Sequence, residues 1–296
     1  MGFRVDKSTV VVSGASQGLG RVMADKLHEL GAKVIVLARS KDKLDEICQI
    51  HNANKLYNNQ FTKSYSIDLS VSSEVVEFGS WLRKENIGVD SVICCAGSSL
   101  PKLFTHLSIE DIDKGIDINY KTCVYLLHVL IPFIRESQYE SRNVVILSSS
   151  VAFYSFIGYT QYAPLKCALK SLSDSLRHEL GAIGIKVTTV FPGNFASEGY
   201  AEENQTKPSI TSDVEGASTP ISVEECADKI FNGLKHGTTY IHTDFIGWVL
   251  NSFSLGFSPR QWFPFQVIFA LIGALFARLI DMYHEYLIKE WLSKNE

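Results

Sequence analysis

The sequence predicts an α/β fold built on a doubly wound parallel sheet. Short apolar runs alternate with helical patterns along most of the chain. The runs are apolar throughout, as strands are when helices cover both faces of a parallel sheet. Crossovers between such strands are right-handed, which leads to a doubly wound sheet that binds ligands at the carboxyl ends of its strands. A hydrophobic content of 46% is ample for such a core.

Most of the expected strands are runs of Val, Ile and Leu that are too short to be helices. In chain order they are residues 9–13, 33–38, 64–69, 91–96, 143–147, 186–191 and a short run at 238–242.

Helices are expected where apolar residues recur at helical spacing or where a capping signal stands. The expected helices are residues 21–30, one opened by Ser108-x-x-Asp111, residues 161–180, and one opened by Ser222-x-x-Glu225. Residues 194–220 are polar and rich in Ser, Thr, Glu and Pro, which predicts a loop or lid.

A glycine-rich loop follows the first strand, with the spacing Gly14-x-x-x-Gly18-x-Gly20. Gly14 permits a tight turn, Gly18 lets the backbone approach a pyrophosphate, and Gly20 allows the next helix to pack closely on the strand. The alternative is a glycine-rich turn without a ligand. The residues between these glycines that we also expect at a dinucleotide cofactor are Ser16, Gln17 and Leu19.

The end of the second strand predicts NADPH rather than NADH. A site for NAD commonly has Asp or Glu here, which binds the ribose 2′-hydroxyl. This chain has Arg39 instead, with Lys41 and Lys43 nearby. A guanidinium matches a phosphate in geometry and charge, so we expect Arg39 and Lys43 at the 2′-phosphate of NADPH. The alternative is a solvated basic turn.

Four polar residues form a candidate catalytic set. Tyr162 and Lys166 are four residues apart on an expected helix, which puts a phenol and an ammonium on one face. Ser149 follows the strand at 143–147, and Asn119 lies upstream. The alternative is a surface tyrosine, a solvated lysine and a serine-rich turn.

Together these motifs resemble the short-chain dehydrogenase/reductase family, which has a Rossmann-type fold. The resemblance covers roughly residues 7–242. The residues that carry it are Gly14, Gly18, Gly20, Asp68, Leu69, Ala96, Gly97, Asn119, Ser149, Tyr162, Lys166, Pro192 and Gly193.

The resemblance implies a role for each polar group in ketone reduction. Tyr162 would protonate the substrate oxygen and Ser149 would hydrogen-bond it. Lys166 would lower the pKa of Tyr162 from about 10 and hold the nicotinamide ribose. Asn119 would hold a water that relays protons from Lys166. The further residues implied at the cofactor are Asp68, Leu69, Ala96, Gly97, Pro192, Gly193, Asn194 and Phe195.

One motif departs from the family pattern, which is often Asn-Asn-Ala-Gly at the end of the fourth strand. This chain has Cys94-Cys95-Ala96-Gly97. The turn at Gly97 is kept, but any contact made by the first Asn is lost. We expect this change to affect cofactor affinity without removing catalysis.

The segment after the sixth strand resembles the fungal 3-ketodihydrosphingosine reductases within this family. The likeness lies in residues 191–200, in the Ser148-Ser149-Ser150 turn and in residues 156–160. It implies reduction of the 3-keto group of a long-chain sphingoid base at a membrane. A steroid, retinoid or acyl-chain reductase with the same catalytic set is an alternative, and so is a catalytically silent NADP-binding scaffold on a membrane.

The apolar excess lies at the C-terminal end, which divides the chain into a catalytic domain (1–244) and a hydrophobic tail (245–296). Residues 245–280 carry only two charges, Arg260 and Arg278. Their aromatic residues are Phe245, Trp248, Phe253, Phe257, Trp262, Phe263, Phe265, Phe269 and Phe276. This composition predicts membrane association, and a dimer interface or a core cap is the alternative. The resemblance implies that the membrane is that of the endoplasmic reticulum, with the catalytic domain facing the cytosol.

The way the tail meets a membrane stays open. Residues 263–277 are shorter than the roughly 20 apolar residues of a span. They are also interrupted by Pro264 and Gln266. A hairpin or an interfacial helix would keep both ends cytosolic. The spacing of Phe265, Phe269, Ile272 and Phe276 suits an interfacial helix.

Composition also argues against some classes of partner. A net charge of −4 gives no basic excess for nucleic acid. The six cysteines and eight histidines show no zinc-site spacing, so no metal is expected. A homodimer through the helix that carries Tyr162 and the one before it is typical of the family; Leu126, Leu127 and Leu130 suit that interface and suit the core equally.

Overall fold

A seven-stranded parallel sheet with the strand order β3-β2-β1-β4-β5-β6-β9 forms the centre of the molecule. The computed structural model describes residues 2–216, 219–254 and 262–295. The strands are β1 (Thr9–Ser13), β2 (Lys33–Ala38), β3 (Thr62–Ser66), β4 (Ser91–Cys94), β5 (Asn143–Leu147), β6 (Lys186–Phe191) and β9 (Tyr240–His242). The order reverses between β1 and β4, so the fold is the expected doubly wound, Rossmann-like α/β fold.

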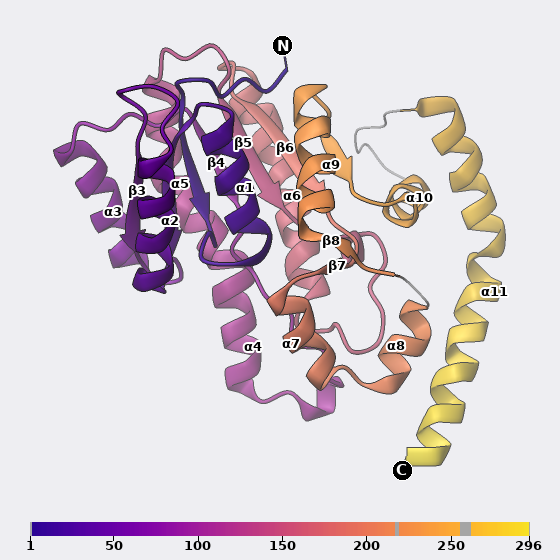
Figure 1. Ribbon diagram of the computed structural model, residues 1–296. Coiled ribbons are helices and arrows are strands. Elements are labelled where there is room, and N and C mark those ends of the chain that lie inside the picture. Colours follow the sequence, from indigo (N-terminus) through magenta and orange to yellow (C-terminus); the bar gives the residue numbers. More distant parts are fainter. Residues whose placement is uncertain (1, 217–218, 255–261, 296) are drawn as a thin grey trace.

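Helices cover both faces of the sheet (Figure 1). On one face lie α1 (Gly18–Glu29), α2 (Lys41–Ala53) and α9 (Val223–Lys235). On the other lie α3 (Ser72–Lys84), α5 (Thr122–Glu136) and α6 (Ala163–Gly181). Because both faces are covered, the central strands β1, β4 and β5 are buried along their whole length.

The remaining short elements lie toward the carboxyl ends of the strands. They are η1 (Phe104–His106), α4 (Ile109–Ile116), η2 (Asp117–Lys121), η3 (Ser150–Ala152), β7 (Phe195–Ala196), α7 (Glu198–Thr206), α8 (Ser209–Glu215) and β8 (Ile221–Ser222). The capping signals are confirmed: Ser108 and Asp111 form a reciprocal capping box on α4, and Ser222 caps α9.

The prediction of a loop at residues 194–220 is wrong for most of that segment. It folds into α7 and α8, and the two-residue strand β7 pairs with β8. The Ser197 hydroxyl accepts a hydrogen bond from the backbone N–H of Tyr200 and so caps α7. Gly216, at φ +78°, ends α8. Short polar helices of this kind lack the apolar periodicity by which helices are recognised.

Strand β3 begins and ends earlier than predicted. Thr62 pairs with Val34, and the strand ends at Ser66. Ile67 and Leu69 follow the strand and are buried in the core. Their apolar side chains moved the predicted strand toward the C-terminus, because an edge strand of polar residues gives a weaker signal than the buried turn after it.

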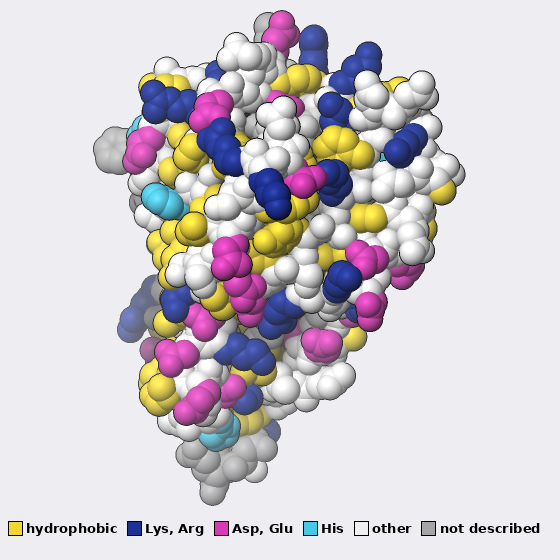
Figure 2. Space-filling model, turned by 90° about the vertical axis from the view of Figure 1, so that its left-hand side faces the viewer, with side chains coloured by type: hydrophobic (Ala, Val, Ile, Leu, Met, Phe, Trp, Pro, Cys, Tyr) yellow, Lys and Arg dark blue, Asp and Glu magenta, His cyan; other side chains and the backbone are white. Residues whose placement is uncertain are grey.

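Leu126, Leu127 and Leu130 pack in the core of the chain itself. They are therefore not part of a surface that a second subunit could contact. The face of the molecule turned away from the C-terminal helix carries acidic and basic side chains mixed together (Figure 2).

The C-terminal segment forms α10 (Phe245–Phe253) and α11 (Phe263–Asn295). Figure 1 shows α11 along the side of the molecule, beside α10 and α8. Within the described ranges, no helix alone has the length and apolar composition of a membrane span; Phe263–Phe276 and Arg278–Trp291, bent by 44°, meet those criteria only as a pair. Phe257 and Arg260 of the predicted tail lie outside the described residues.

Candidate active site

The conformation of the loop after β1 favours glycine at Gly14, Gly18 and Gly20. Gly14 and Gly18 have φ values of +67° and +54°, in the left-handed region that favours glycine. A Cβ on Gly14 would lie 2.9 Å from backbone atoms of Ala96, and one on Gly20 would lie 2.2 Å from the carbonyl oxygen of Gly14. The N-terminus of α1, which begins at Gly18, is therefore open to an approaching phosphate.

A cavity of about 830 Å³ extends from this loop to the predicted catalytic residues. It lies at the carboxyl ends of the strands, where doubly wound sheets bind ligands. The predicted site residues that line it are Gly14, Ser16, Gln17, Gly18, Leu19, Gly20, Arg39, Asp68, Leu69, Ala96, Gly97, Ser149, Tyr162, Lys166, Pro192, Gly193, Asn194 and Phe195. The structure thus brings together all the predicted cofactor residues except Lys43, and all the predicted catalytic residues except Asn119.

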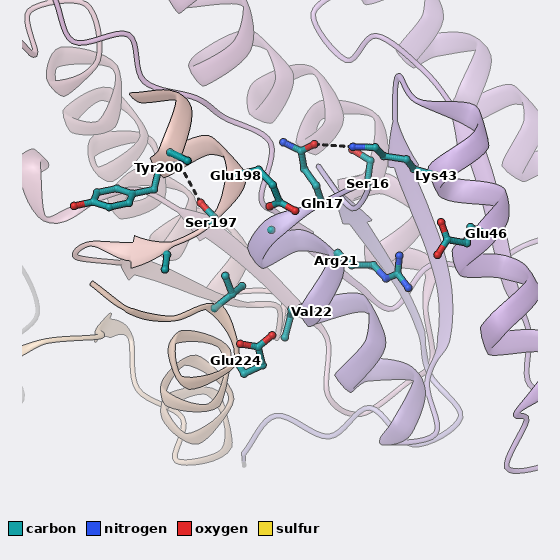
Figure 3. A pocket seen from close by; sticks show the side chains of 14 residues that line it. Ser16, Gln17, Arg21, Val22, Lys43, Glu46, Ser197, Glu198, Tyr200 and Glu224 are labelled. Atoms are coloured by element: carbon teal, nitrogen blue, oxygen red, sulfur yellow. Dashed lines mark hydrogen bonds between the residues drawn. The ribbon is translucent and has the colours of Figure 1, made fainter. Parts of the chain in front are cut away.

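Lys43 faces a neighbouring cavity of about 710 Å³, between α1, α2, α7 and α9 (Figure 3). Its ammonium donates a 3.0 Å hydrogen bond to Oε1 of Gln17, a residue that lines both cavities. Lys43 therefore supports the glycine loop from outside.

Arg39 and Asp68 mark the end of the larger cavity that is farthest from Tyr162 along the sheet, after β2 and β3. Hydrogen bonds from Ser70 lower the pKa of Asp68 below its usual value, against the effect of burial, and the nearby Arg39 adds to this lowering. The Arg39 side chain is exposed at this end of the cavity. Its charge is available to an anionic group there.

Lys166 and Tyr162 lie at the opposite end, at the start of α6. The side chain of Lys166 is buried, and its Nζ donates a 3.2 Å hydrogen bond to the carbonyl oxygen of Leu147. The same Nζ is 5.2 Å from the centroid of the Tyr162 ring. Burial lowers the pKa of Lys166 to about 8, so the ammonium is still the main form at neutral pH.

The pKa of Tyr162 is raised rather than lowered. Burial is the main cause, and the negative charge of Glu203 adds to it; a hydrogen bond with Ser149 acts in the opposite direction. The phenol is therefore protonated at neutral pH, which is the form that a proton donor in ketone reduction needs.

Asn119 lies behind the cavity wall, in the π-helical turn η2 between α4 and α5. Its amide nitrogen donates to the carbonyl oxygens of Ser98 (2.8 Å) and Gly115 (3.2 Å), and its oxygen accepts from the N–H of Ser98 (3.1 Å). These hydrogen bonds use both amide hydrogens and one lone pair of Oδ1, which leaves the second lone pair of Oδ1 for a water. Asn119 thus fixes the Ser98 backbone next to Gly97, and its role as a water ligand stays a prediction.

Cys94 and Cys95, which replace the two Asn of the family pattern, both have raised pKa values. Burial raises the pKa of Cys95 to about 12, and that of Cys94 is raised by its hydrogen bond with Cys123 and by burial. Both thiols therefore stay protonated at neutral pH. The turn after them is held by Ser13, whose hydroxyl oxygen accepts hydrogen bonds from the backbone N–H groups of Cys95 and Ala96.

Sequence reasoning missed the residues that α7 adds to the site. The carboxylate of Glu203 accepts hydrogen bonds from the hydroxyls of Tyr159 and Ser99, and all three line the cavity. Lys207 bridges Glu203 at 3.0 Å and Glu215 at 2.8 Å. Ser197 followed by Glu198, an N-cap with an acid in the first turn, was the signal that could have placed this helix.

Comparison with known proteins agrees with this geometry. The family model for short chain dehydrogenase matches residues 8–208. The chain belongs to the short-chain dehydrogenase family. It is therefore an NAD(P)-dependent oxidoreductase.

Two curated members of the family are similar over nearly the whole chain. The 3-ketodihydrosphingosine reductase TSC10 of Debaryomyces hansenii is 46% identical over 281 residues, covering 92% of this chain and 85% of that protein. The protein of the same name from Eremothecium gossypii is 36% identical over 308 residues. This alignment covers 100% of this chain and 97% of that protein. A solved short-chain dehydrogenase from Sphingobium yanoikuyae in complex with NADPH has a TM-score of 0.70 at 22% identity, covering 80% of this chain and 88% of that one.

The described residues fit a nicotinamide dinucleotide. The loop exposes the start of α1 to a pyrophosphate, and the cavity is continuous from there to Tyr162. At the catalytic end a Cβ on Gly97 would lie only 3.0 Å from Oδ1 of Asn119 and 3.2 Å from Nζ of Lys166, so glycine keeps this wall open. In the described ranges no three metal-ligating side chains converge.

Proposed function

We propose that this chain catalyses the NADPH-dependent reduction of 3-ketodihydrosphingosine to dihydrosphingosine, a step of sphingolipid biosynthesis. The observation that carries the proposal is 46% identity, over 92% of the chain, to a protein named for that activity. The cavity supports it, because Ser149, Tyr162 and Lys166 all line the same end.

Ser149 and Tyr162 would bind the ketone oxygen between their hydroxyls. Each donates a hydrogen bond that becomes stronger as negative charge develops on this oxygen in the transition state. The nicotinamide supplies the hydride when it is bound. Tyr162 then gives its proton to the oxygen, which completes the alcohol.

Lys166 would stabilise the phenolate that Tyr162 becomes. Its Nζ is 5.2 Å from the Tyr162 ring centroid and is buried, so its charge is little screened by water. As in the family pattern, the same ammonium would hold the nicotinamide ribose. The 3.2 Å hydrogen bond from Nζ of Lys166 to the carbonyl oxygen of Leu147 holds the ammonium in this position before the cofactor binds.

Arg39 would select NADPH over NADH. It follows β2 at the position where an acidic residue would bind a free 2′-hydroxyl. Its guanidinium can form two parallel hydrogen bonds with a phosphate. Lys43, which contacts Gln17 and not the larger cavity, would add only long-range charge.

The substrate end of the cavity suits an alkyl chain. Beyond Ser149 its walls are formed partly by apolar and aromatic side chains from η3, from the loop after it, and from α8 and α10. These residues are Val151, Tyr154, Phe156, Val214, Ile246 and Leu250. Since α10 contributes two of them, the first helix of the C-terminal segment takes part in forming the site.

We also propose that α11 lies at the surface of the endoplasmic reticulum membrane, with the catalytic domain in the cytosol. One side of the helix packs on α10: Phe269 lies 5.3 Å from Trp248 between ring centroids. The other side exposes large apolar residues, which are Phe263, Phe265, Ile268, Leu271, Ile272, Leu275, Phe276, Leu279, Met282, Tyr283 and Tyr286. An unpaired apolar face of this length is typical of an interfacial helix.

Of the four residues in the predicted stripe, Phe265, Ile272 and Phe276 are exposed, but the exposed face also includes residues outside that stripe. The expected stripe included Phe269, which instead packs against Phe245 and Trp248. The stripe runs through Ile268, Leu271 and Leu275. The pattern of apolar residues goes round most of the helix, so sequence spacing alone did not decide which face meets α10.

The assay that tests the proposed function measures NADPH oxidation by the purified full-length chain with three substrates. 3-Ketodihydrosphingosine is expected to be reduced with the highest kcat/KM, and dihydrosphingosine should be identified as the product. Preference for a 3-ketosteroid or a retinal would favour the alternative within the enzyme class. Cofactor binding without turnover of any ketone would favour the silent scaffold.

A further inference from the structure

The carboxylate of Glu203 lies at the catalytic end of the cavity although no step of ketone reduction requires it. The side chain projects from α7 and is 15% exposed. Its Oε1 accepts a 2.5 Å hydrogen bond from the Tyr159 hydroxyl, and its Oε2 accepts one from the Ser99 hydroxyl. These contacts hold the carboxylate at the cavity wall on the side of Tyr162.

The charge of Glu203 is unfavourable for the catalytic tyrosine. It is close enough to raise the pKa of Tyr162 further, next after burial among the causes. It would also destabilise the phenolate that Tyr162 becomes when it gives up its proton. A negative charge at this place therefore opposes the reaction unless a positive charge joins it.

Among the described residues, the cation that contacts Glu203 compensates its charge only in part. Lys207 is 4% exposed and contacts Glu203 at 3.0 Å, but it also contacts Glu215 at 2.8 Å. One ammonium between two carboxylates leaves a net charge of −1 on this group of three side chains. This group of three side chains thus retains a capacity for one more cation, while the charge of Lys166 lies on the other partner, beside the Tyr162 ring.

We propose that Glu203 binds the protonated 2-amino group of the substrate. This inference rests on the proposed function and names the substrate class as α-amino ketones with a long alkyl chain. In such a ketone the amino nitrogen is bonded to the carbon next to the carbonyl. When the carbonyl oxygen contacts Ser149 and Tyr162, the ammonium is therefore beside the catalytic end, where Glu203 lies.

The pairing has two consequences. The ammonium neutralises the charge of Glu203, so the barrier to proton donation from Tyr162 falls only when an amino ketone is bound. A steroid, a retinal or an acyl ketone brings no cation and leaves the carboxylate uncompensated. Glu203 would thus discriminate against neutral ketones as well as attract amino ketones.

The test compares two substrates with the full chain and a Glu203→Gln variant. The substrates are 3-ketodihydrosphingosine and the same long-chain hydroxyketone without the 2-amino group. For the amino ketone, the variant is expected to lose about 30-fold or more in kcat/KM, as is usual when one member of a desolvated charge pair is removed. For the neutral ketone it should keep or gain activity. Asp213→Asn removes an exposed carboxylate on α8 and is the matched control. It should leave kcat/KM unchanged for both substrates.

Equal losses for both substrates would overturn the proposal. They would mean that Glu203 only stabilises the position of α7, through its contacts with Tyr159 and Lys207. NADPH affinity and Tm show whether the variant folds. If it does not, the wild-type chain decides: it should prefer the amino ketone by about 30-fold or more, and equal kcat/KM values would contradict the inference. Failure of the wild type to reduce either ketone would instead contradict the proposed function.

Discussion

The hydroxyl of Tyr159 donates a 2.5 Å hydrogen bond to Oε1 of Glu203, which connects the loop before the catalytic helix to α7. The Lys207 ammonium lies 5.7 Å from the centroid of the same tyrosine ring and bridges Glu203 to Glu215 on α8. Helices α7 and α8, which we call the lid, are therefore attached to the catalytic end by polar contacts between largely buried groups.

Lys207→Met should loosen this lid. The substitution leaves Glu203 and Glu215 close together without a counter-charge, so we expect a loss of about 3 kcal/mol in the free energy of unfolding, at the lower end for a broken buried pair. Faster amide hydrogen exchange in residues 198–215 would localise the effect. Lys229→Met removes an exposed pair with Glu225 and should cost under about 1 kcal/mol. Equal losses for the two variants would contradict the structural importance of Lys207.

Arg39→Asp should change the cofactor preference. Loss of the guanidinium and a new negative charge should raise KM for NADPH by about 10- to 100-fold, which corresponds to the loss of a hydrogen bond to a charged group. KM for NADH should fall or stay the same. Lys41→Asp makes the same change of charge at a nearby exposed residue. It controls for long-range electrostatic effects on cofactor binding. Equal changes in the two KM values would show that Arg39 does not bind the 2′-phosphate.

The reaction should slow as pH rises through about 8. The pKa of Lys166 is lowered to about 8 by burial, and a lysine is charged only below its pKa. The charge that stabilises the Tyr162 phenolate is therefore lost above this pH, while the raised pKa of Tyr162 keeps the phenol protonated. The measurement is kcat/KM from pH 6 to 10 with a neutral long-chain ketone, whose own charge is constant. A flat profile up to pH 10 would contradict the role of Lys166.

Charged residues on the outer side of α11 should weaken membrane binding. Leu271 and Leu275 are 62% and 76% exposed, so Leu271→Glu with Leu275→Glu should leave the fold intact. We expect the double variant to lose most of its co-flotation with phosphatidylcholine and phosphatidylserine vesicles. Val76→Glu, on α3 and 60% exposed, is the control. Unchanged flotation with an altered oligomeric mass would show that this face contacts a second subunit instead.

Most strands of the central sheet could be predicted because they are largely apolar. The bounds of β1, β2, β5 and β6 coincide with the predicted runs, since a strand buried on both faces has no other composition available to it. Helices α2 and α3 were not predicted, and α7 and α8 were taken as a loop. Their stability depends on caps and on tertiary contacts such as those of Lys207, which sequence periodicity does not show.

The candidate site shows the same division. Ser149, Tyr162 and Lys166 were found because motif spacing fixes their positions, after β5 for Ser149 and at the start of α6 for the other two. Glu203 was missed because it reaches the cavity from a polar helix with no motif. The exposed side of α11 was only partly predicted, because the packing of Phe269 on Trp248 is a tertiary contact.

The central claim is that the chain transfers a hydride to C3 of 3-ketodihydrosphingosine while Tyr162 protonates the oxygen. It is tested most directly by mass spectrometry of the product formed with NADPH in which both hydrogens at C4 are replaced by deuterium. We expect dihydrosphingosine with a single deuterium at C3, and a fall in its rate of formation of about 100-fold or more in Tyr162→Phe with NADPH still bound. Product without deuterium, no product from the wild type, or near-normal turnover by Tyr162→Phe would contradict the account.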